Sequence, residues 1–559
     1  MNRRLPCPQP AALAGALLVA VLAASPAAAQ KLAGPSPPVP GLQQNEINVL
    51  EARGDTLYIG PCLNRTTDGG DPFAGLTDAG GLCTSGSPVR IRSLDVEGDV
   101  LVAGLGRAAA GGVSAAEGFL RSRDGGDSFT ALAPQLDTGA DTTVQYGVNI
   151  LPTLPVVTPD ESTPFAVDYV DSTSAVWVAG RASGLRRSTD GGETFERLAL
   201  PPDSLDAISP VRRYRFPVLP KRGETGPGAF NHIVSSVLVD ETGTIWAGTS
   251  RGVNRSRPSD VFVFENPETG ERIRERAWRR FGFDNTAAAG APDTLGEGLS
   301  GNFVTRIGEQ PLPEERNPVW MSTRLTVIEG EESGVTFTRD GGDTFYQTLL
   351  GEVVNDFAFR GDTVYAAGRR GVFISEGGPA PAGDSVRYEW RLENDFDGAE
   401  LPEAAVANRR PVFAVAATEA ALWAGTEDGL LRSTDGGDTW EAFRTRVPTD
   451  PDEPTEAVPQ TETYAYPNPF SPVAAPAGVV RIVAEAEEGG GTATVQLYDF
   501  AMRAVRELTA DCDASGRCVA AWDGTGADGA RVANGVYFYE IDLPDSGDEA
   551  PRGKIMVLE

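Results

Sequence analysis

Short apolar runs that stop at small residues recur along most of the chain. Each run gathers Val, Ile, Leu, Trp or Tyr and then reaches Gly, Ala or Ser. The seven runs are Leu57–Gly60, Leu101–Gly104, Val176–Gly180, Ile245–Gly248, Val319–Ser322, Val364–Gly368 and Leu422–Gly425. Branched and aromatic residues favour strands, and the Gly-rich and polar turns between them favour reversals. The pattern predicts many short β-strands rather than long helices.

The residues around these runs repeat as well. In six units the run is followed by Gly-Leu, Gly-Val or Gly-Phe and then Ser or Thr, as in Gly429–Ser433. Another apolar run precedes most units, as Val353–Phe359 does. Repeated β units of about 40 residues or more indicate a propeller. We therefore predict an all-β chain with a seven-bladed β-propeller over residues 45–445. A β-helix or a sandwich fits such repeats poorly.

The spacing between units is uneven. The extra residues fall around 133–165, 199–230 and 258–302, where periodicity is weak. Long loops on a rigid frame often carry binding, so these insertions are candidate ligand-binding loops. The alternative is that they only decorate the blades.

An acidic octapeptide, here called the acidic box, follows five of the units. Its clearest copies are Ser188–Phe195 and Ser433–Trp440, and the first copy, Thr66–Phe73, has Pro72 at the Thr position. The aspartates of the five boxes are Asp68, Asp124, Asp190, Asp340 and Asp435. Such an Asp accepts backbone N–H groups and closes a turn, and paired glycines allow positive φ. We predict a structural role; a Ca²⁺ loop would need more regularly spaced ligands.

The acidic box resembles the Asp-box, or BNR repeat, of sialidase-type propellers. Members of that family with sialidase activity use three arginines, a Tyr–Glu pair and an acidic Asp, with an Arg-Ile-Pro motif early in the propeller. The nearest string here is Arg215-Phe216-Pro217, which lies mid-chain in an insertion. The resemblance therefore implies the architecture, and no residue is assigned as catalytic.

The pattern changes after a Pro-rich, acidic linker at 446–463. Residues 464–559 contain Tyr466–Phe470, a Trp-Asp-Gly-Thr turn at Trp522 and the strand Gly535–Tyr539, and they end on a basic-apolar strand from Lys554. Short strands separated by turns predict a small β-sandwich. These motifs resemble the Ig-like domain of flagellar hook-capping proteins and the type A sorting domain of the type IX secretion system. That resemblance implies delivery by an outer-membrane translocon; the alternative is an Ig-like spacer.

The first 29 residues have the pattern of a secretory signal peptide. Arg3 and Arg4 precede an apolar run, and Ala27-Ala28-Ala29 offers a cleavage site. The run is short for a membrane span, and no later segment is long and apolar enough. We expect periplasmic transit and then a secreted or outer-surface location, with no membrane span after cleavage.

Export places the remaining cysteines in an oxidising compartment. Cys62, Cys83, Cys512 and Cys518 form two sequence-local pairs, and of three connectivities we favour the local one. Neither spacing is Cys-x-x-Cys, which argues against a redox or metal pair.

Charge and composition exclude several functions. The formal net charge is -31, which argues against nucleic-acid binding. His232 is the single histidine, so a multi-histidine metal site is excluded, and its place before a strand predicts a structural role. We expect no cofactor. The predicted function is a non-catalytic binding or scaffold module for an extracellular glycan or protein; the alternative is an extracellular glycoside hydrolase, sialidase-like or polysaccharide-degrading.

Overall fold

The structure is a computed structural model. It describes residues 30–31, 42, 46–67, 74–75, 82, 88–109, 113–221, 227–265, 270, 272–283, 298–313, 316–376, 380–382, 385–394, 411–426, 429–443, 463–466, 468–472, 480–486, 491–512, 517–543 and 550–558. The predicted signal peptide, Asp68, Cys83 and nearly all of the predicted linker lie outside these residues.

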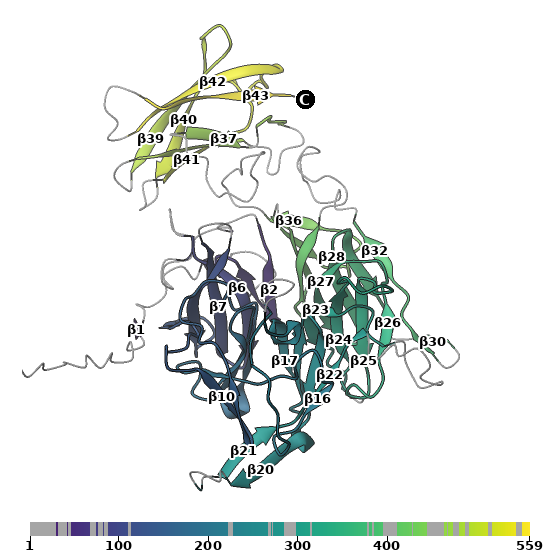
Figure 1. Ribbon diagram of the computed structural model, residues 1–559. Helices are drawn as coiled ribbons and strands as arrows, with labels where there is room; N and C mark the ends of the chain where they lie inside the picture. The colour runs from purple at the N-terminus through teal and green to yellow at the C-terminus, as the bar shows by residue number, and fades with distance from the viewer. Residues whose placement is uncertain are drawn as a thin grey trace, which may run out of the picture.

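Seven antiparallel sheets form the blades of a β-propeller, which confirms the predicted fold class (Figure 1). The first strands are β2 (Val49–Arg53), β6 (Arg90–Glu97), β12 (Ala166–Val170), β17 (Val234–Val239), β23 (Phe303–Glu309), β27 (Val354–Arg360) and β33 (Val412–Ala417). The second strands are β3 (Thr56–Gly60), β7 (Val100–Ala108), β13 (Ala175–Gly180), β18 (Ile245–Thr249), β24 (Val319–Arg324), β28 (Thr363–Gly368) and β34 (Leu422–Thr426).

The outer half of each blade completes a four-stranded meander. The third strands are β4 (Asn64–Thr66), β8 (Ser114–Ser122), β14 (Gly184–Ser188), β19 (Gly252–Ser256), β25 (Gly334–Thr338), β29 (Gly371–Ser375) and β35 (Gly429–Ser433). The fourth strands are β5 (Ala74–Gly75), β9 (Thr130–Leu132), β15 (Glu196–Arg197), β22 (Trp278–Phe281), β26 (Tyr346–Thr348), β32 (Arg391–Glu393) and β36 (Glu441–Phe443). Two blades carry a fifth strand, β1 (Gln30–Lys31) beside β9 and β16 (Ala207–Ile208) beside β22.

The first strands form a closed ring around the propeller axis. Each packs against the first strand of the next blade, and β33 of the seventh blade packs against β2 of the first. A backbone bond from Ile47 N to Thr426 O (2.8 Å) joins these two blades. The ring therefore closes by side-by-side packing of its first and last blades.

Tryptophans of the second strands fill the space between blades. Trp246 packs with Val304 and Met321 of the fifth blade, and it is fully buried. Trp423 of the seventh blade packs in the same way against residues of the first, including Leu57. Burial of a large aromatic ring is worth several kcal/mol, so this repeated position holds neighbouring blades together.

The insertions carry more structure than their weak periodicity predicts. Residues 133–165 contain the hairpin β10 (Thr143–Tyr146) and β11 (Asn149–Pro152), and 199–230 contains β16. Residues 258–302 contain the hairpin β20 (Val261–Glu265) and β21 (Arg272–Arg276) and also the fourth strand β22. A second such hairpin, β30 (Ala380–Ala382) and β31 (Ser385–Arg387), occupies the same place in the sixth blade. In the two blades that lack an acidic box, a hairpin therefore joins the third and fourth strands.

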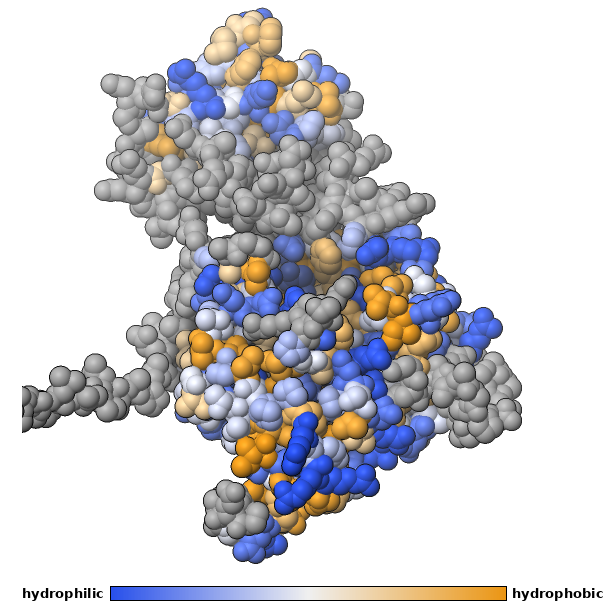
Figure 2. Space-filling model, viewed as in Figure 1, coloured by the Kyte–Doolittle hydropathy of each residue, from blue (hydrophilic) through white to orange (hydrophobic). Residues whose placement is uncertain are grey.

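Three short 3₁₀ turns complete the described propeller: η1 (Asp171–Thr173), η2 (Phe230–His232) and η3 (Pro258–Asp260). No described helix is long and apolar enough to cross a membrane. The visible propeller surface intersperses hydrophilic and hydrophobic residues (Figure 2).

The C-terminal strands form a small two-layer sandwich. They are β37 (Thr463–Tyr466), β38 (Val480–Glu485), β39 (Thr492–Tyr498), β40 (Ala504–Cys512), β41 (Arg517–Trp522), β42 (Gly535–Asp542) and β43 (Arg552–Val557). One core includes Ile482, Leu497 and Ile555 from strands of both layers. The strands β40 and β41 pair only at their ends, where a disulfide joins Cys512 and Cys518. This corner connects the layers. Cys62 is also disulfide-bonded.

Candidate functional site

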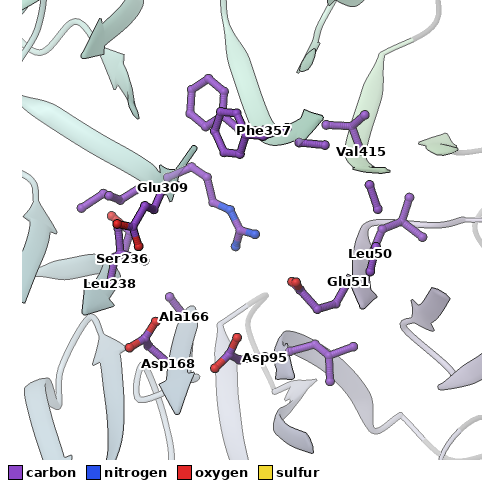
Figure 3. A pocket seen from close by; sticks show the side chains of 18 of the residues that line it. Leu50, Glu51, Asp95, Ala166, Asp168, Ser236, Leu238, Glu309, Phe357 and Val415 are labelled. Carbon is purple, nitrogen blue, oxygen red and sulfur yellow. The ribbon is translucent and has the colours of Figure 1, made fainter. Parts of the chain in front are cut away.

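The propeller axis holds a cavity of about 340 Å³. Its walls are the first strands of all seven blades, which present apolar side chains such as Leu50 and Phe357 together with acidic ones (Figure 3). In Figure 3 the carboxyl groups of Glu51, Asp95 and Asp168, from three consecutive blades, point into this space. The sequence analysis did not single out these positions, because a lone acid on a short strand resembles an ordinary surface residue.

Several cavity carboxylates also join neighbouring blades. Asp95 accepts a hydrogen bond from Tyr169 N (2.6 Å), and Asp168 accepts one from Val239 N (3.1 Å). In each pair the donor lies on the next blade. The inner edge of a first strand leaves N–H groups without a strand partner, and a buried N–H needs an acceptor. These carboxylates supply it.

Arg306 is the basic residue among those that line the cavity. It forms an ion pair with Asp356 (2.7 Å), whose side chain is 7% exposed and also accepts Val415 N (3.1 Å). The Asp356 carboxylate raises the pKa of Arg306, so the guanidinium stays charged. This pair holds the fifth, sixth and seventh blades together.

Burial changes the acidity of the cavity. It raises the pKa of Glu51 to about 8, that of Asp95 to about 6 and that of Glu309 to about 7, and it raises that of Asp168 well above its usual range. Protonated and ionised carboxyl groups therefore coexist near neutral pH. Such a cavity can bind polar or cationic groups, and a protonated carboxyl can act as a proton donor.

Five first strands carry a β-bulge near their start. The bulged residues are Arg92, Ser235, Thr305, Asn355 and Phe413. A bulge re-aims a side chain, and here Ser235 Oγ reaches Val304 O (2.5 Å) and Asn355 Nδ2 reaches Val412 O (2.8 Å) on the next blade. Two of the bulged residues thus add hydrogen bonds from one blade to the next.

The described acidic boxes share one hydrogen-bond pattern. In the third blade, Asp190 Oδ1 accepts Thr194 N (3.0 Å) and Oδ2 accepts the Thr194 hydroxyl (2.6 Å), while Gly192 N donates to Ser188 Oγ (2.7 Å). Gly191 and Gly192 have φ of 77° and 96°. Asp124, Asp340 and Asp435 make equivalent bonds. Both carboxylate oxygens hold protein donors, as a structural turn requires.

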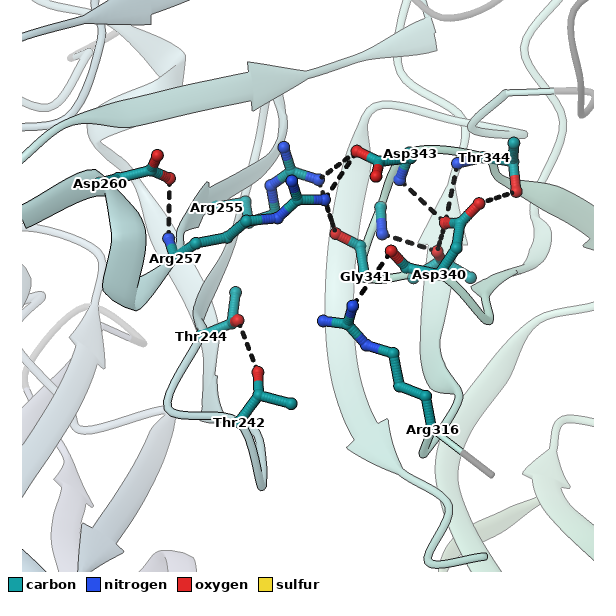
Figure 4. Close-up of polar contacts among 12 residues, drawn as sticks. Thr242, Thr244, Arg255, Arg257, Asp260, Arg316, Asp340, Gly341, Asp343 and Thr344 are labelled. Atoms are coloured by element: carbon teal, nitrogen blue, oxygen red, sulfur yellow. Dashed lines mark hydrogen bonds and ion pairs between the residues drawn. The ribbon is translucent and has the colours of Figure 1, made fainter. Parts of the chain in front are cut away.

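An arginine of the preceding blade clamps each of these four boxes. At the box of the fifth blade, Arg255 Nη1 of the fourth blade donates to Gly341 O (2.6 Å), and the nearby Arg257 pairs with Asp343 (2.6 Å) (Figure 4). The other clamps join Arg65 to Gly125 O, Arg121 to Gly191 O and Arg391 to Gly436 O. The sixth box residue, such as Asp343, is thus the acidic partner of the clamp.

Sequence reasoning missed these clamps, although their signal was present. Arg65, Arg121 and Arg255 each directly precede the Ser or Thr that ends the third strand. A guanidinium donates several hydrogen bonds in a fixed plane, which suits one carbonyl and one carboxylate. Part of the arginine content of the chain therefore has an architectural cause.

His232 is buried and bonded to backbone on both sides. Its Nε2 lies 2.9 Å from Leu200 O, and its Nδ1 accepts Leu219 N (3.0 Å). Burial lowers its pKa, so it is neutral. The ring of Phe216, from the string at 215–217, packs 6.3 Å away. This part of the insertion is therefore a packed support.

The described residues contain no group of three or more His, Cys, Asp or Glu side chains arranged to hold a metal ion. The cavity carboxylates and the boxes engage backbone, hydroxyl and guanidinium donors instead.

The family model for the FlgD Ig-like domain matches residues 476–546. The C-terminal unit is an Ig-like domain. No curated protein sequence matches the chain.

Solved structures show only distant similarity. An enzyme, the GH74 protein of Niastella koreensis, is 13% identical over 94% of this chain and 74% of its own, with a TM-score of 0.42. PorZ, described as an essential surface component of the type-IX secretion system of Porphyromonas gingivalis, is 13% identical over 92% and 75%, with a TM-score of 0.29. YCF48 from Cyanidioschyzon merolae is 12% identical over 78% and 96%, with a TM-score of 0.33. The propeller assignment rests on the sheet order and the closed ring of this chain.

Proposed function

We propose that this chain is an exported, non-catalytic β-propeller that binds an extracellular glycan or protein and is delivered by its C-terminal Ig-like domain. The proposal that the chain is non-catalytic rests on the hydrogen bonds that the carboxylates at the propeller axis accept. Asp95, Asp168 and Asp356 each hold a backbone N–H of the next blade. A catalytic acid or base must instead reach a proton on the substrate, so these three groups serve the frame.

A glycoside hydrolase is the second candidate, and two cavity residues favour it. The pKa values of Glu51, about 8, and Glu309, about 7, suit a general acid near neutral pH. Glu309 accepts Glu241 N (3.0 Å), which leaves Glu51 as the better proton donor. A hydrolase would lose its activity in a Glu51→Gln variant.

One pair of assays on the full mature chain distinguishes the binding function from the hydrolase. A glycan array measures binding, and a polysaccharide panel measures release of reducing ends. We expect binding without turnover, and we expect Glu51→Gln to leave binding in place. Turnover that disappears in Glu51→Gln would replace the binding proposal by the hydrolase.

The delivery role rests on the match to the Ig-like domain and on the motifs of residues 464–559. A chain that lacks 464–559 is expected to stop in the periplasm of its native host, whereas the full chain reaches the surface. Protease accessibility on whole cells measures this, with a periplasmic marker as control. Unchanged surface delivery of the shortened chain would leave the Ig-like domain as a spacer.

A further inference from the structure

One face of the propeller bears two arginines that no described carboxylate neutralises. We call it the entrance face: the end at which the first strands begin and the second strands end. Arg324 ends β24 of the fifth blade there, and Arg369 directly follows β28 of the sixth. In a chain with a net charge of -31, these two cations are close enough to affect each other and form no ion pair among the described residues.

The contacts of Arg324 show that it is held but not neutralised. Its Nη2 donates to Asn355 Oδ1 (3.0 Å), and its Nε is buried without a hydrogen-bond partner in the described structure. Burial and the charge of Arg369 both lower the pKa of Arg324. By contrast, the adjacent Arg370 pairs with Glu352. An anion beside Arg324 and Arg369 would offset their desolvation and mutual repulsion.

Exposed aliphatic side chains lie on the loops next to this arginine pair. Leu325 is 57% exposed, Val327 100% and Leu350 50%. They belong to the loops that join β24 to β25 and β26 to β27, and the bond from Gly351 N to Ser333 O (2.8 Å) ties these loops together. Clustered exposed apolar side chains mark surfaces that bind other macromolecules.

The composition of the patch favours a protein over a glycan. Leu and Val offer no flat ring for a sugar to stack on, but they match apolar side chains of a peptide. Of the carboxylates in these loops, Glu331 bonds Thr326 and Glu352 pairs with Arg370, whereas Glu329 and Glu332 are exposed. Arg324, with a buried Nε that lacks a partner, and the nearby Arg369 therefore favour carboxylates on that protein.

We propose that the entrance face binds a peptide segment of a partner protein that is both acidic and apolar. Its carboxylates bind Arg324 and Arg369, and its apolar side chains cover Leu325, Val327 and Leu350. The inference rests on the proposed binding function and names the chemistry of the partner.

The test uses fluorescence anisotropy with the full mature chain. The probe is a short labelled peptide of alternating glutamate and leucine, compared with its glutamine–leucine analogue and with labelled oligogalacturonate. We expect the glutamate–leucine peptide to bind best and to weaken as salt is added. Arg324→Gln combined with Arg369→Gln is expected to weaken it at least about tenfold.

Two further variants separate a loss of the binding site from a loss of the fold. Arg369→Gln alone changes an exposed residue and is expected to weaken binding while the fold is retained, as is Leu325→Ser combined with Val327→Ser. The matched control is Arg53→Gln with Arg123→Gln, which removes the same charge from exposed positions at the opposite end of the strands. Equal losses in the control would overturn the site.

Three other outcomes would also decide between the proposed peptide site and its alternatives. Binding of oligogalacturonate but not of the peptide would replace the proposal by an acidic-glycan site, and equal binding of the glutamine analogue would reject the role of charge. Polysaccharide turnover with intact peptide binding would overturn the non-catalytic function and leave this site standing.

Discussion

The arginine clamp shows how one side chain serves two blades. Arg121 belongs to the second blade, is 8% exposed, and donates to Gly191 O (2.6 Å) in the box of the third blade. Its guanidinium also lies 3.6 Å from Glu193. A buried carbonyl that loses a charged donor keeps the full cost of its own desolvation. The clamp therefore links the box turn to the packing between blades.

Replacement of Arg121 by methionine tests this role. We expect Arg121→Met to lower the free energy of unfolding by about 1.5–3 kcal/mol, because a charged hydrogen bond is lost and Gly191 O is left without that donor. Denaturant unfolding measures the change. Arg123→Met, at an exposed position two residues away, is the control and should change stability little.

Glu51 makes the stability depend on pH. Its folded pKa of about 8 lies above the ordinary value of 4.5, chiefly because of burial, with Asp95 raising it further and Arg306 lowering it. Between these two values the folded chain keeps a proton that the unfolded chain has released. The contribution of this group therefore makes the folded state less stable as pH rises from about 4.5 to 8.

A Glu51→Gln variant keeps the neutral form at every pH. We expect it to be more stable than the parent by about 2 kcal/mol at pH 8, since the partial exposure of the side chain reduces the full linkage effect. Near pH 4 the two proteins should match. Unfolding curves across this range measure the difference, with the exposed-site variant Glu419→Gln as control. A constant difference at all pH values would contradict the assignment.

At the scale of elements, the turn between the third and fourth strands takes one of two forms. The acidic box closes it compactly in four described blades, and a hairpin replaces the box in the fourth and sixth.

The C-terminal sandwich has its own special connection, the corner at which β40 and β41 meet. There Cys512 and Cys518 pair directly across the strands and form a disulfide.

Loss of this disulfide should loosen the Ig-like domain alone. For a closed loop of this length the chain-entropy relation gives a loss of about 2 kcal/mol in Cys512→Ser with Cys518→Ser. Unfolding of the full mature chain, followed by exchange of amide protons in β38–β43, measures it. The propeller strands serve as the internal control, and equal loss of protection in both domains would contradict a local effect.

At the scale of the whole molecule, ring closure decides whether the blades form one cooperative unit. The seventh blade meets the first through Trp423 and through close backbone approach at Gly425. A Cβ at Gly425 would lie 2.5 Å from Ile47 O. Among the described residues no strand is exchanged between these blades, so packing and the bond from Ile47 N to Thr426 O close the ring.

A Gly425→Ala variant is therefore expected to destabilise the entire propeller. Overpacking at such a contact costs about 1–3 kcal/mol, and the loss should appear in one cooperative thermal transition of the propeller. Gly139→Ala is the control, because a Cβ there meets nothing within 4 Å. A change confined to the seventh blade would show that the ring is not cooperative.

The sequence by itself determined the β class, the seven repeats and the change of pattern before the C-terminal domain. These features are local: strand propensity, a glycine-bearing turn and a strand that ends in small residues are set by nearest neighbours. The Arg before the Ser or Thr of the third strands was equally visible, but its partner carbonyl lies on another blade, so its role was not.

The tertiary structure alone decided what meets at the axis and on the entrance face. Glu51, Asp95 and Asp168 come together because ring closure brings first strands from distant parts of the sequence side by side. Arg324 and Arg369 become neighbours because two turns end at the same face. No local pattern encodes these distances. Repeated strands specify the frame, whereas the position of each strand in the closed ring determines which isolated charges become a site.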